Sequence, residues 1–427
     1  MIRNSLKTHL LAAAAVAALA APITAHAAGF QLKEQSVSGQ GTSFAGVTAG
    51  GNGDASAMFF NPAAMGLVQG NEIVGSLTGI LPYSKIENAR ATRAQAVGGT
   101  PIVGNANPGD AGQDALLPAG YGVYSLNPDV KLGLAVTAPW GLITKYPGNW
   151  VGRYHGITSD LQTINIQPTV SYRVAPTLTV GGGLQFQRAK ARLTGANDAG
   201  LFDIYNDLEG DDWGWGGVAG VMFEPAKGTR LGLSYRSAVK HELSGDVSFS
   251  GAPFTIPTTG AHAKLVTPEI VSFGAYQDIT DRWAVMADVT WTNWSRFREL
   301  AVFLNNGTTN ITEERWKDSW FFSVGTSYKV TDALTLRGGV AYDKSPIPDE
   351  FRTPRIPDED RFWVSIGAGY KVTEALQLDA AYTHIFVRDS TLNLTDDFSL
   401  PERGRGNLSG KYKNHVDIIG VQARYSF

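Results

Sequence analysis

Residues 361–372 read Arg-Phe-Trp-Val-Ser-Ile-Gly-Ala-Gly-Tyr-Lys-Val, and this stretch decides the fold class. Every second residue from Phe362 to Val372 is apolar, whereas most of the residues between them are charged or small, among them Arg361 and Ser365. An apolar residue at every second position is typical of a β-strand with one apolar face, because helices repeat their apolar residues every three or four positions. The stretch therefore predicts a strand.

The same alternation recurs along the chain from Asn71 to the terminal Phe427. Each segment is near the roughly 9–11 residues that a tilted strand needs to cross a bilayer. Short turns and long polar connections alternate between the segments, which places all turns at one end and all long loops at the other. We therefore predict an all-β fold, a 14-stranded antiparallel transmembrane β-barrel. The expected strands centre on 71–83, 119–127, 129–138, 161–174, 176–188, 215–225, 229–239, 269–279, 281–292, 319–330, 333–342, 361–372, 375–386 and 415–427.

Aromatic side chains recur near the expected strand ends on the apolar face, for example Trp283, Trp291, Tyr328 and Tyr370. Membrane barrels carry such girdles of aromatic rings where the wall meets the lipid headgroups. The alternative is that these rings form the core of a secreted soluble β protein. We favour the membrane barrel, because a soluble barrel would turn its apolar face inward and would rarely need so many residues of strand.

The composition excludes several functional classes. The chain has 427 residues, 36 Lys and Arg against 39 Asp and Glu, a formal net charge of -3 and no cysteine. Without a basic excess, nucleic-acid binding has little support. Without cysteine, disulfide scaffolds, thiolate metal sites and cysteine nucleophiles are excluded. Only 18% of the residues are charged, less than the roughly 25% of an ordinary soluble domain.

The N-terminal part of the chain divides into two segments before the barrel. Residues 1–27 have a basic start, a short apolar run and the small-x-small site Ala25-His26-Ala27, which together indicate a signal peptide cleaved on secretion. Residues 28–70 are rich in Gly, Ala and Ser and show no sustained alternation. They could form a disordered tail or a plug inside the barrel, and their composition alone leaves both open. The barrel itself is expected over 71–427.

Several motifs together resemble the FadL family of Gram-negative outer-membrane transporters for long-chain fatty acids, with relatives for aromatic hydrocarbons. The resemblance extends over essentially the whole chain. The motifs that carry it are Ala28-Gly29-Phe30-Gln31-Leu32 with Glu34-Gln35-Ser36, Asn61-Pro62-Ala63-Ala64-Met65, Ala138-Pro139-Trp140-Gly141-Leu142 with Trp150-Val151-Gly152-Arg153-Tyr154, Trp291-Thr292-Asn293-Trp294-Ser295, and the stretch from Arg352 to Trp363.

The resemblance implies a monomeric barrel in the outer membrane, closed by an N-terminal hatch at residues 28–70. Phe30 and Asn61-Pro62-Ala63 would carry the hatch signature. It also implies that loops capture a hydrophobic ligand, that an internal pocket near the hatch holds it, and that hatch movement with a kink in the third strand lets it leave sideways. Pro62 has a fixed φ and no N–H, so it sets a rigid turn, and Asn61 can bond local backbone.

Ligand-contacting residues are expected in the loops and on the inner face. An apolar pocket with a few polar groups would suit the ligand. If the ligand is a fatty acid, its carboxylate needs a cation. Asp288 and Asp379 could instead form ion pairs with the inner-face cations and stabilise the lumen. For any single residue named here, we favour that structural role over ligand binding. The loop candidates are Leu201, Phe202, Ile204, Tyr205 and Leu208, expected as a short amphipathic helix, and Phe249, Phe254 and Ile256; the inner-face cations are Arg173, Arg337, Lys371 and Arg424.

The sequence favours passive transport over other activities. No spacing of histidines indicates a metal site or a catalytic centre, and no phosphate-binding glycine loop indicates ATP-driven transport. We expect no enzyme activity, cofactor or metal, and contact with outer-membrane lipid and lipopolysaccharide. Two alternatives stay open: a general diffusion porin for small polar solutes, and a surface adhesin or receptor barrel. The choice between fatty acid and aromatic hydrocarbon also stays open, because a hydrocarbon needs no cation.

Overall fold

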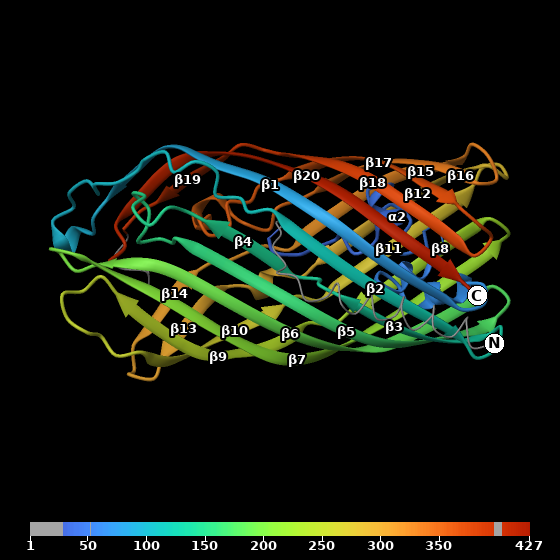
Figure 1. The fold of residues 1–427 in the computed structure, drawn as a ribbon, viewed down its shortest axis with the longest axis horizontal. Helices are drawn as coiled ribbons and strands as arrows, with labels where there is room; N and C mark the ends of the chain where they lie inside the picture. Colours follow the sequence, from blue (N-terminus) through green and yellow to red (C-terminus); the bar gives the residue numbers. More distant parts are fainter. Residues whose placement is uncertain (1–28, 52, 397–403) are drawn as a thin grey trace.

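The structure is a computed structural model and describes residues 29–51, 53–396 and 404–427. The predicted signal peptide lies outside these residues. Twenty strand segments form one closed sheet with antiparallel neighbours (Figure 1). The segments are β1 (Glu72–Thr92), β2 (Ala115–Ser125), β3 (Val130–Thr137), β4 (Gly141–Lys145), β5 (Thr158–Ala175), β6 (Leu178–Asp198), β7 (Asp203–Ala226), β8 (Thr229–Arg236), β9 (Val239–Ser250), β10 (Thr259–Thr267), β11 (Ile270–Asp278), β12 (Trp283–Thr292), β13 (Glu299–Leu304), β14 (Thr309–Glu313), β15 (Ser319–Lys329), β16 (Leu334–Asp343), β17 (Arg361–Lys371), β18 (Leu376–Val387), β19 (Ser390–Leu394) and β20 (Asn407–Ser426).

The barrel has 14 strands, as predicted. Six barrel strands consist of two segments in line, namely β3 with β4, β8 with β9, β10 with β11, β12 with β13, β14 with β15, and β18 with β19. The barrel closes where β1 pairs with β20, from Glu72 opposite Ser426 to Thr92 opposite Asn407. Among the described residues the sheet is closed all round except beside residues 115–119 of β2, which fits a membrane barrel because lipid cannot hydrogen-bond an exposed backbone.

The period of two in the sequence corresponds to two faces of the wall. On β17, Phe362 and Ile366 are 46% and 62% exposed, whereas Trp363 and Ser365 are 1% and 2% exposed. The exposed apolar side chains point outward; the inward side chains are mostly polar or small, with a few large apolar ones such as Trp363 packed against the hatch. Among the described residues, no helix is long and apolar enough to cross a membrane.

The strands extend further into the long connections than the alternation predicted. β7 begins at Asp203 and β6 continues to Asp198, so the expected loop 189–214 is mostly a hairpin. The amphipathic helix expected at 201–208 is wrong. Residues 203–208 are strand, because they bond to β6 on one side and those from Tyr205 onward to β9 on the other. Arg192 and Asp207 add an ion pair of 2.6 Å across the hairpin.

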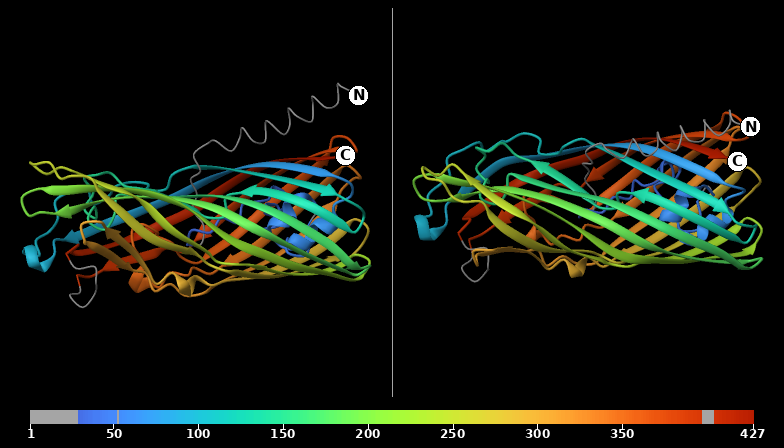
Figure 2. Two further views of the ribbon diagram at one scale, coloured as in Figure 1. Left: turned by 90° about the horizontal axis from the view of Figure 1, so that it is seen from below. Right: turned by 60° about the horizontal axis from the view of Figure 1, so that its bottom comes forward.

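Residues 29–51 and 53–70 lie inside the barrel near the end that carries the short turns, and the long loops lie at the opposite end (Figure 2). The disordered-tail alternative is therefore wrong. This segment, called the hatch below, contains the helix α2 (Val37–Gln40) and the 3-10 turns η2 (Ala55–Phe59) and η3 (Pro62–Leu67). Three further 3-10 turns occur in the long connections: η4 (Gln95–Val97), η5 (Trp294–Arg296) and η6 (Asp349–Phe351).

A belt of glycines on the inner wall brings the hatch backbone close to the barrel. At each position of this belt, an added Cβ would collide with the hatch. At Gly181 it would lie 2.5 Å from both the nitrogen of Ala63 and the carbonyl carbon of Pro62. The hatch is therefore wedged against the wall at defined positions. The belt consists of Gly133, Gly181, Gly220, Gly232, Gly274, Gly325, Gly339, Gly367 and Gly420.

Candidate functional site: a lumenal cavity beside a break in the wall

The Asn61-Pro62-Ala63 motif fixes the second half of the hatch to the barrel. Asn61 is the N-cap of η3, and its side-chain oxygen accepts a hydrogen bond of 3.0 Å from the Ala63 N–H. Its side-chain amide donates to the carbonyl of Thr48 in the hatch, at 2.7 Å, and to that of Val221 in β7, at 3.1 Å. Pro62 occupies the first helical position, where its missing N–H costs nothing. Asn61 thus joins two hatch segments and the wall.

Phe30, at the start of the hatch, lies in a box of aromatic rings. Its ring centroid is 4.6 Å from Trp294, 5.7 Å from Trp316 and 6.0 Å from Trp140, and it is only 2% exposed. Most of these ring pairs meet edge to face, the arrangement that the ring quadrupoles favour. The box holds the N-terminal arm of the hatch, residues 29–36, against the wall.

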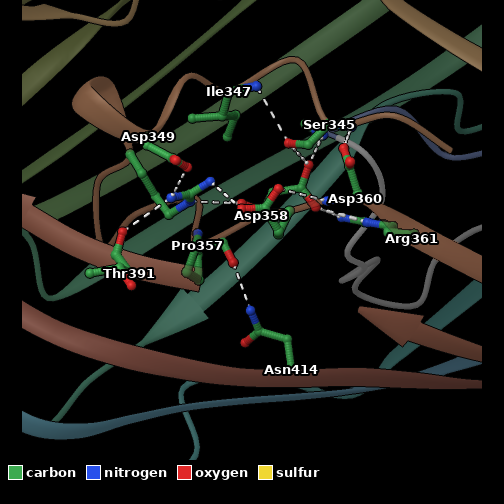
Figure 3. A network of polar contacts seen from close by, with 12 residues as sticks. Ser345, Ile347, Asp349, Pro357, Asp358, Asp360, Arg361, Thr391 and Asn414 are labelled. Carbon is green, nitrogen blue, oxygen red and sulfur yellow. Dashed lines mark hydrogen bonds and ion pairs between the residues drawn. The ribbon is translucent and has the colours of Figure 1, made fainter. Parts of the chain in front are cut away.

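A polar network beside this arm is built from the connection between β16 and β17 (Figure 3). The Asp358 carboxylate accepts hydrogen bonds from the Gly29 N–H at 3.0 Å and from the Ser345 hydroxyl at 2.8 Å, and it forms an ion pair with Arg361. Arg352, which is fully buried, pairs with Glu359 at 2.8 Å. The long connection thus folds back into the lumen and holds the first described residue of the hatch.

A cavity lies between the hatch and the wall. The hatch contributes Leu32, Phe44 and Phe60, and the wall contributes Ile270 and Phe321. The lining is mostly apolar, as expected for a site that takes a hydrophobic ligand. The centre of a water molecule can reach only about 50 Å³ of it, which is room for a few waters. In this closed form, the cavity cannot hold a long alkyl chain.

Two cations that the sequence analysis did not select, Lys33 and Arg236, line this cavity. The Arg236 guanidinium donates to the Phe59 carbonyl at 2.7 Å and to the side-chain oxygen of Gln167 at 3.0 Å. Of the described residues, none places a carboxylate within ion-pair distance of Arg236. The Lys33 ammonium lies 4.2 Å from the centre of the Phe321 ring. Burial lowers the pKa of the Lys33 ammonium.

Arg236 could have been found on the inner face, because it alternates with Leu233 and Tyr235 along β8. What the alternation could not show is that Arg236 has no ion pair with any described acid. Asp288, expected on the inner face, lines the same cavity.

The cations that the sequence analysis selected have protein partners elsewhere in the lumen. Arg337 pairs with Asp379 at 2.7 Å, and Arg424 pairs with Glu72 at 2.6 Å. Arg173 donates to the hatch carbonyl of Gly66 at 3.3 Å. Of the two acids expected to pair with these cations, Asp379 does so, whereas Asp288 has no ion pair among the described residues. Lys371 is exposed at the turn end of β17. Ligand contact by these residues stays a prediction.

The loop candidates gather at the end of the barrel opposite the hatch (Figure 1). Phe202 and Phe254 pack edge to face with centroids 6.1 Å apart, and Leu201 beside them is 97% exposed. Ile204, Tyr205 and Leu208 lie on β7, and Phe249 on β9 lies opposite Asn206 of β7. These residues form an apolar rim, but none of them lines the cavity described above.

The barrel wall is interrupted beside the cavity. β3 ends at Thr137 and the chain re-enters the sheet as β4 at Gly141, with both segments paired to β5. Ala115–Ala119 of β2 pair with β1 on one edge, but no described strand pairs with their other edge. The wall therefore has a break between β2 and the 138–140 segment, at Pro139. The family resemblance implied a kink in the third strand but did not give its position.

The hatch supplies the hydrogen bonds that the sheet lacks at this break. The Leu32 N–H donates to the Pro139 carbonyl at 2.8 Å, and the Gly141 N–H donates to the Phe30 carbonyl at 2.9 Å. The Gln35 side chain donates to the Ala138 carbonyl at 2.8 Å and accepts from its N–H at 3.2 Å. Because Leu32 also lines the cavity, one short hatch segment separates the cavity from the break.

A closed 14-stranded barrel with an apolar outer face, a lumen filled by its own N-terminal segment and an apolar internal cavity defines the class of outer-membrane transport barrels. The family model for outer membrane protein transport proteins (OMPP1/FadL/TodX) matches residues 17–427. The chain belongs to this family, whose members are transporters of the outer membrane and not enzymes.

Relatives of known name or structure match this chain over nearly its full length. The long-chain fatty acid transport protein of Escherichia coli O6:H1 is 30% identical and is covered completely by a match that includes all of this chain. A crystal structure of a Pseudomonas aeruginosa FadL homologue superimposes with a TM-score of 0.86 at 26% identity, covering 94% of this chain and 100% of that one. The Ralstonia pickettii toluene transporter TbuX shares the fold, with a TM-score of 0.64 at 19% identity over 90% of this chain and 98% of its own.

Proposed function

We propose that this protein mediates passive uptake of long-chain fatty acids across the outer membrane. The observation that carries the proposal is Arg236, a buried guanidinium in an apolar cavity with no carboxylate partner among the described residues. Buried charges are normally paired, because desolvating a lone charge is costly. A ligand carboxylate would supply the missing charge, and its alkyl chain would contact Phe44, Phe60 and Phe321. A hydrocarbon would leave Arg236 without a partner.

The path that we propose has three parts. The exposed apolar rim around Leu201, Phe202 and Phe254 would capture the ligand from the outside. The cavity would then hold it with the carboxylate at Arg236 and Lys33. The break at Pro139 would release it sideways into the membrane, as the barrel lumen itself is filled by the hatch. The barrel would act as a monomer, because every step uses residues of one chain.

The N-terminal arm of the hatch is the part that we expect to move. It separates the cavity from the break, and the cavity is too small for an alkyl chain in the closed form. The glycine belt holds the segments around residues 41–49 and 61–65 against the wall by close backbone contact. At the break, residues 30–32 of the arm make two backbone hydrogen bonds to the wall, which a ligand can replace more easily than a wedged backbone.

The charge of Arg236 provides the direct test of substrate class. We expect Arg236→Gln to weaken oleate binding by roughly tenfold or more, since a hydrogen bond between charged groups contributes about 1.5–3 kcal/mol, and to leave binding of oleate methyl ester unchanged. Arg230→Gln is a matched control. Arg230 lies on the same strand and face, donates to the Gly51 carbonyl at 2.8 Å and does not line the cavity. Equal loss for acid and ester would contradict a carboxylate site.

An aromatic hydrocarbon is the second candidate, because the closed cavity is small and mostly apolar. Deletion of the gene and growth on oleate or on toluene as the carbon source would separate the two. Loss of growth on toluene alone would replace the fatty-acid proposal, and normal growth on both would favour an adhesin or receptor barrel. For the porin alternative, deletion of the hatch should raise the conductance in a planar bilayer sharply, whereas a porin would conduct well with the hatch in place.

A further inference from the structure

The outer face of β1, β18 and β20 changes from apolar to polar at one level. On β20 the outward side chains Val421 and Ile419 are exposed and apolar, and the next outward side chain is Asp417. Asp417 accepts hydrogen bonds from Tyr382 at 2.6 Å and from His384 at 2.8 Å, both on β18. A carboxylate on the lipid face is costly within the hydrocarbon, so these residues mark the border of the apolar layer.

Aromatic rings form a row along this border. Tyr83 of β1 stacks on His415 of β20 with centroids 4.8 Å apart, and Phe386 of β18 lies opposite His415 in the strand register. Ten residue steps on β20 separate His415 from Tyr425 near the turn end. At about 3.3 Å per residue and a tilt of about 40°, this corresponds to roughly 25 Å of height, the thickness of the apolar band of such barrels. The row therefore lies at the outer headgroup boundary.

Three lysines lie just beyond this row on the same outward face: Lys85 on β1 and Lys411 and Lys413 on β20. Lys85 and Lys413 are directly opposite in the register, a like-charge pair that is unfavourable by itself. One carboxylate, Glu87, lies 3.2 Å from the Lys85 ammonium and 3.7 Å from that of Lys413. Glu87 also lies opposite Lys411, and Asp110 lies opposite Lys85 on the other edge of β1. Three lysines against these two carboxylates leave one positive charge at headgroup height, with β1 and β20 side by side in Figure 1.

A second charged region of the outer face, on β6 and β7, is balanced. On the β6–β7 hairpin, three cations of β6 pair with carboxylates that lie diagonally across on β7, two positions from the residue directly opposite. The three cations of this ladder are therefore each neutralised by a carboxylate of the neighbouring strand. The pairs are Arg188 with Asp211, Lys190 with Glu209, and Arg192 with Asp207.

We propose that Lys85, Lys411 and Lys413 bind the phosphate groups of a phosphorylated glycolipid in the outer leaflet, with its sugar over the Tyr83–His415 stack. The occupant is a lipid rather than a free anion, because the patch continues directly into the lipid-facing apolar surface at Ile419 and Val421, where acyl chains pack. Glu87 is shared between Lys85 and Lys413, so a phosphate would offset the positive charge that remains on the three lysines. The site is separate from the lumenal cavity and does not depend on the transported substrate.

The test uses the full mature protein in detergent and native mass spectrometry with purified bisphosphorylated lipid A. We expect one tightly retained lipid A, with binding roughly tenfold or more weaker for lipid A lacking both phosphates and for the variant Lys85→Gln/Lys411→Gln/Lys413→Gln. The variant Arg188→Gln/Lys190→Gln/Arg192→Gln removes the same number of charges from the balanced ladder and should bind as the wild type does. Heat resistance of the barrel on gels confirms that each variant is folded.

Three results would overturn the proposal. Equal losses in the two triple variants would show a general charge effect. Unchanged binding in the lysine variant would place the lipid elsewhere. Displacement of lipid A by millimolar inorganic phosphate would indicate a site for a free anion instead of a lipid.

Discussion

The close approach between Gly181 and the hatch yields a sharp prediction. In Gly181→Ala, the new Cβ would lie 2.5 Å from the Ala63 nitrogen and the Pro62 carbonyl carbon, whereas ordinary contacts begin at 3.4 Å. The two backbones must therefore separate by about 0.9 Å. Neither partner is a flexible side chain that could turn away. The shift falls on the Asn61-Pro62-Ala63 turn. The side-chain amide of Asn61 in this turn donates a hydrogen bond of 3.1 Å to the Val221 carbonyl in the wall.

Overpacking of this kind costs about 1–3 kcal/mol. We expect Gly181→Ala to lower the barrel's unfolding temperature and to raise the conductance in planar bilayers, because the hatch is displaced from the wall. Gly182→Ala is the control. It is the next residue on β6, and its added Cβ would come no closer than 3.5 Å, to the Val218 carbonyl. Both variants change the strand propensity of β6 equally, so the difference between them isolates the hatch contact.

Two results would refute this reasoning. If Gly181→Ala conducts and unfolds like the wild type, then the hatch is not wedged at this glycine. If both variants change equally, then the effect arises within β6 and not at the hatch.

Three further predictions concern the lumen. Asp379→Asn should destabilise the barrel by about 3–5 kcal/mol in urea unfolding, since it leaves Arg337 buried without its partner; an effect below 1 kcal/mol would contradict this. Phe30→Ala should cost about 3–5 kcal/mol and speed hydrogen exchange in the arm but not in β17. Burial raises the pKa of the Glu34 carboxyl to about 7, against an ordinary value of 4.5. A raised acid pKa means that stability falls as the pH rises from about 4.5 to 7, so Glu34→Gln should remove about 3 kcal/mol of that loss, and parallel stability curves for both proteins would contradict it.

The barrel could be predicted from sequence because its determinant is local. Each spanning strand carries its own alternation, as 361–372 does, and the lipid outside enforces that alternation in every strand. The strand ends at the short turns could also be predicted, because short connections such as Thr373-Glu374-Ala375 leave no room for more strand. The strand ends at the long loops could not be predicted, since beyond the membrane nothing forces the outward face to be apolar. β6 and β7 therefore continue through polar residues to Asp198 and Asp203.

The helix expected at 201–208 shows the same limit. Leu201, Ile204, Tyr205 and Leu208 have the spacing of a helix face, and a short apolar run cannot distinguish helix from strand. The decision depended on partners distant in sequence. β9 bonds to 205–211 of β7, and these bonds stabilise the extended form. No local pattern in 201–208 contains that information.

In the lumenal site, too, the sequence predicted the local feature but not the contacts between distant strands. Alternation places Arg236 and Arg337 on the inner face with equal force, and only the register between neighbouring strands distinguishes them. Asp379 lies opposite Gly369 and its carboxylate reaches Arg337 across β17, whereas Arg236 donates to neutral acceptors, the Phe59 carbonyl and the Gln167 side chain. An inward cation is therefore a candidate for ligand binding only when the register leaves it without an acid, and sequence periodicity does not contain the register between strands far apart in the chain.

The break at Pro139 and the hatch arm form one unit, and this explains why a proline persists in a barrel wall. Pro139 has no N–H for the sheet, but its carbonyl still needs a donor, and the Leu32 N–H provides it at 2.8 Å. The donor thus comes from the segment that also closes the cavity. If the arm moves, the Pro139 carbonyl loses its partner and the break becomes accessible to water or ligand. Gln35 helps to keep the arm in place at the break, because its side chain hydrogen-bonds both the carbonyl and the N–H of Ala138. The same hydrogen bonds therefore hold both the arm and the wall, and we expect the cavity and the wall to open together.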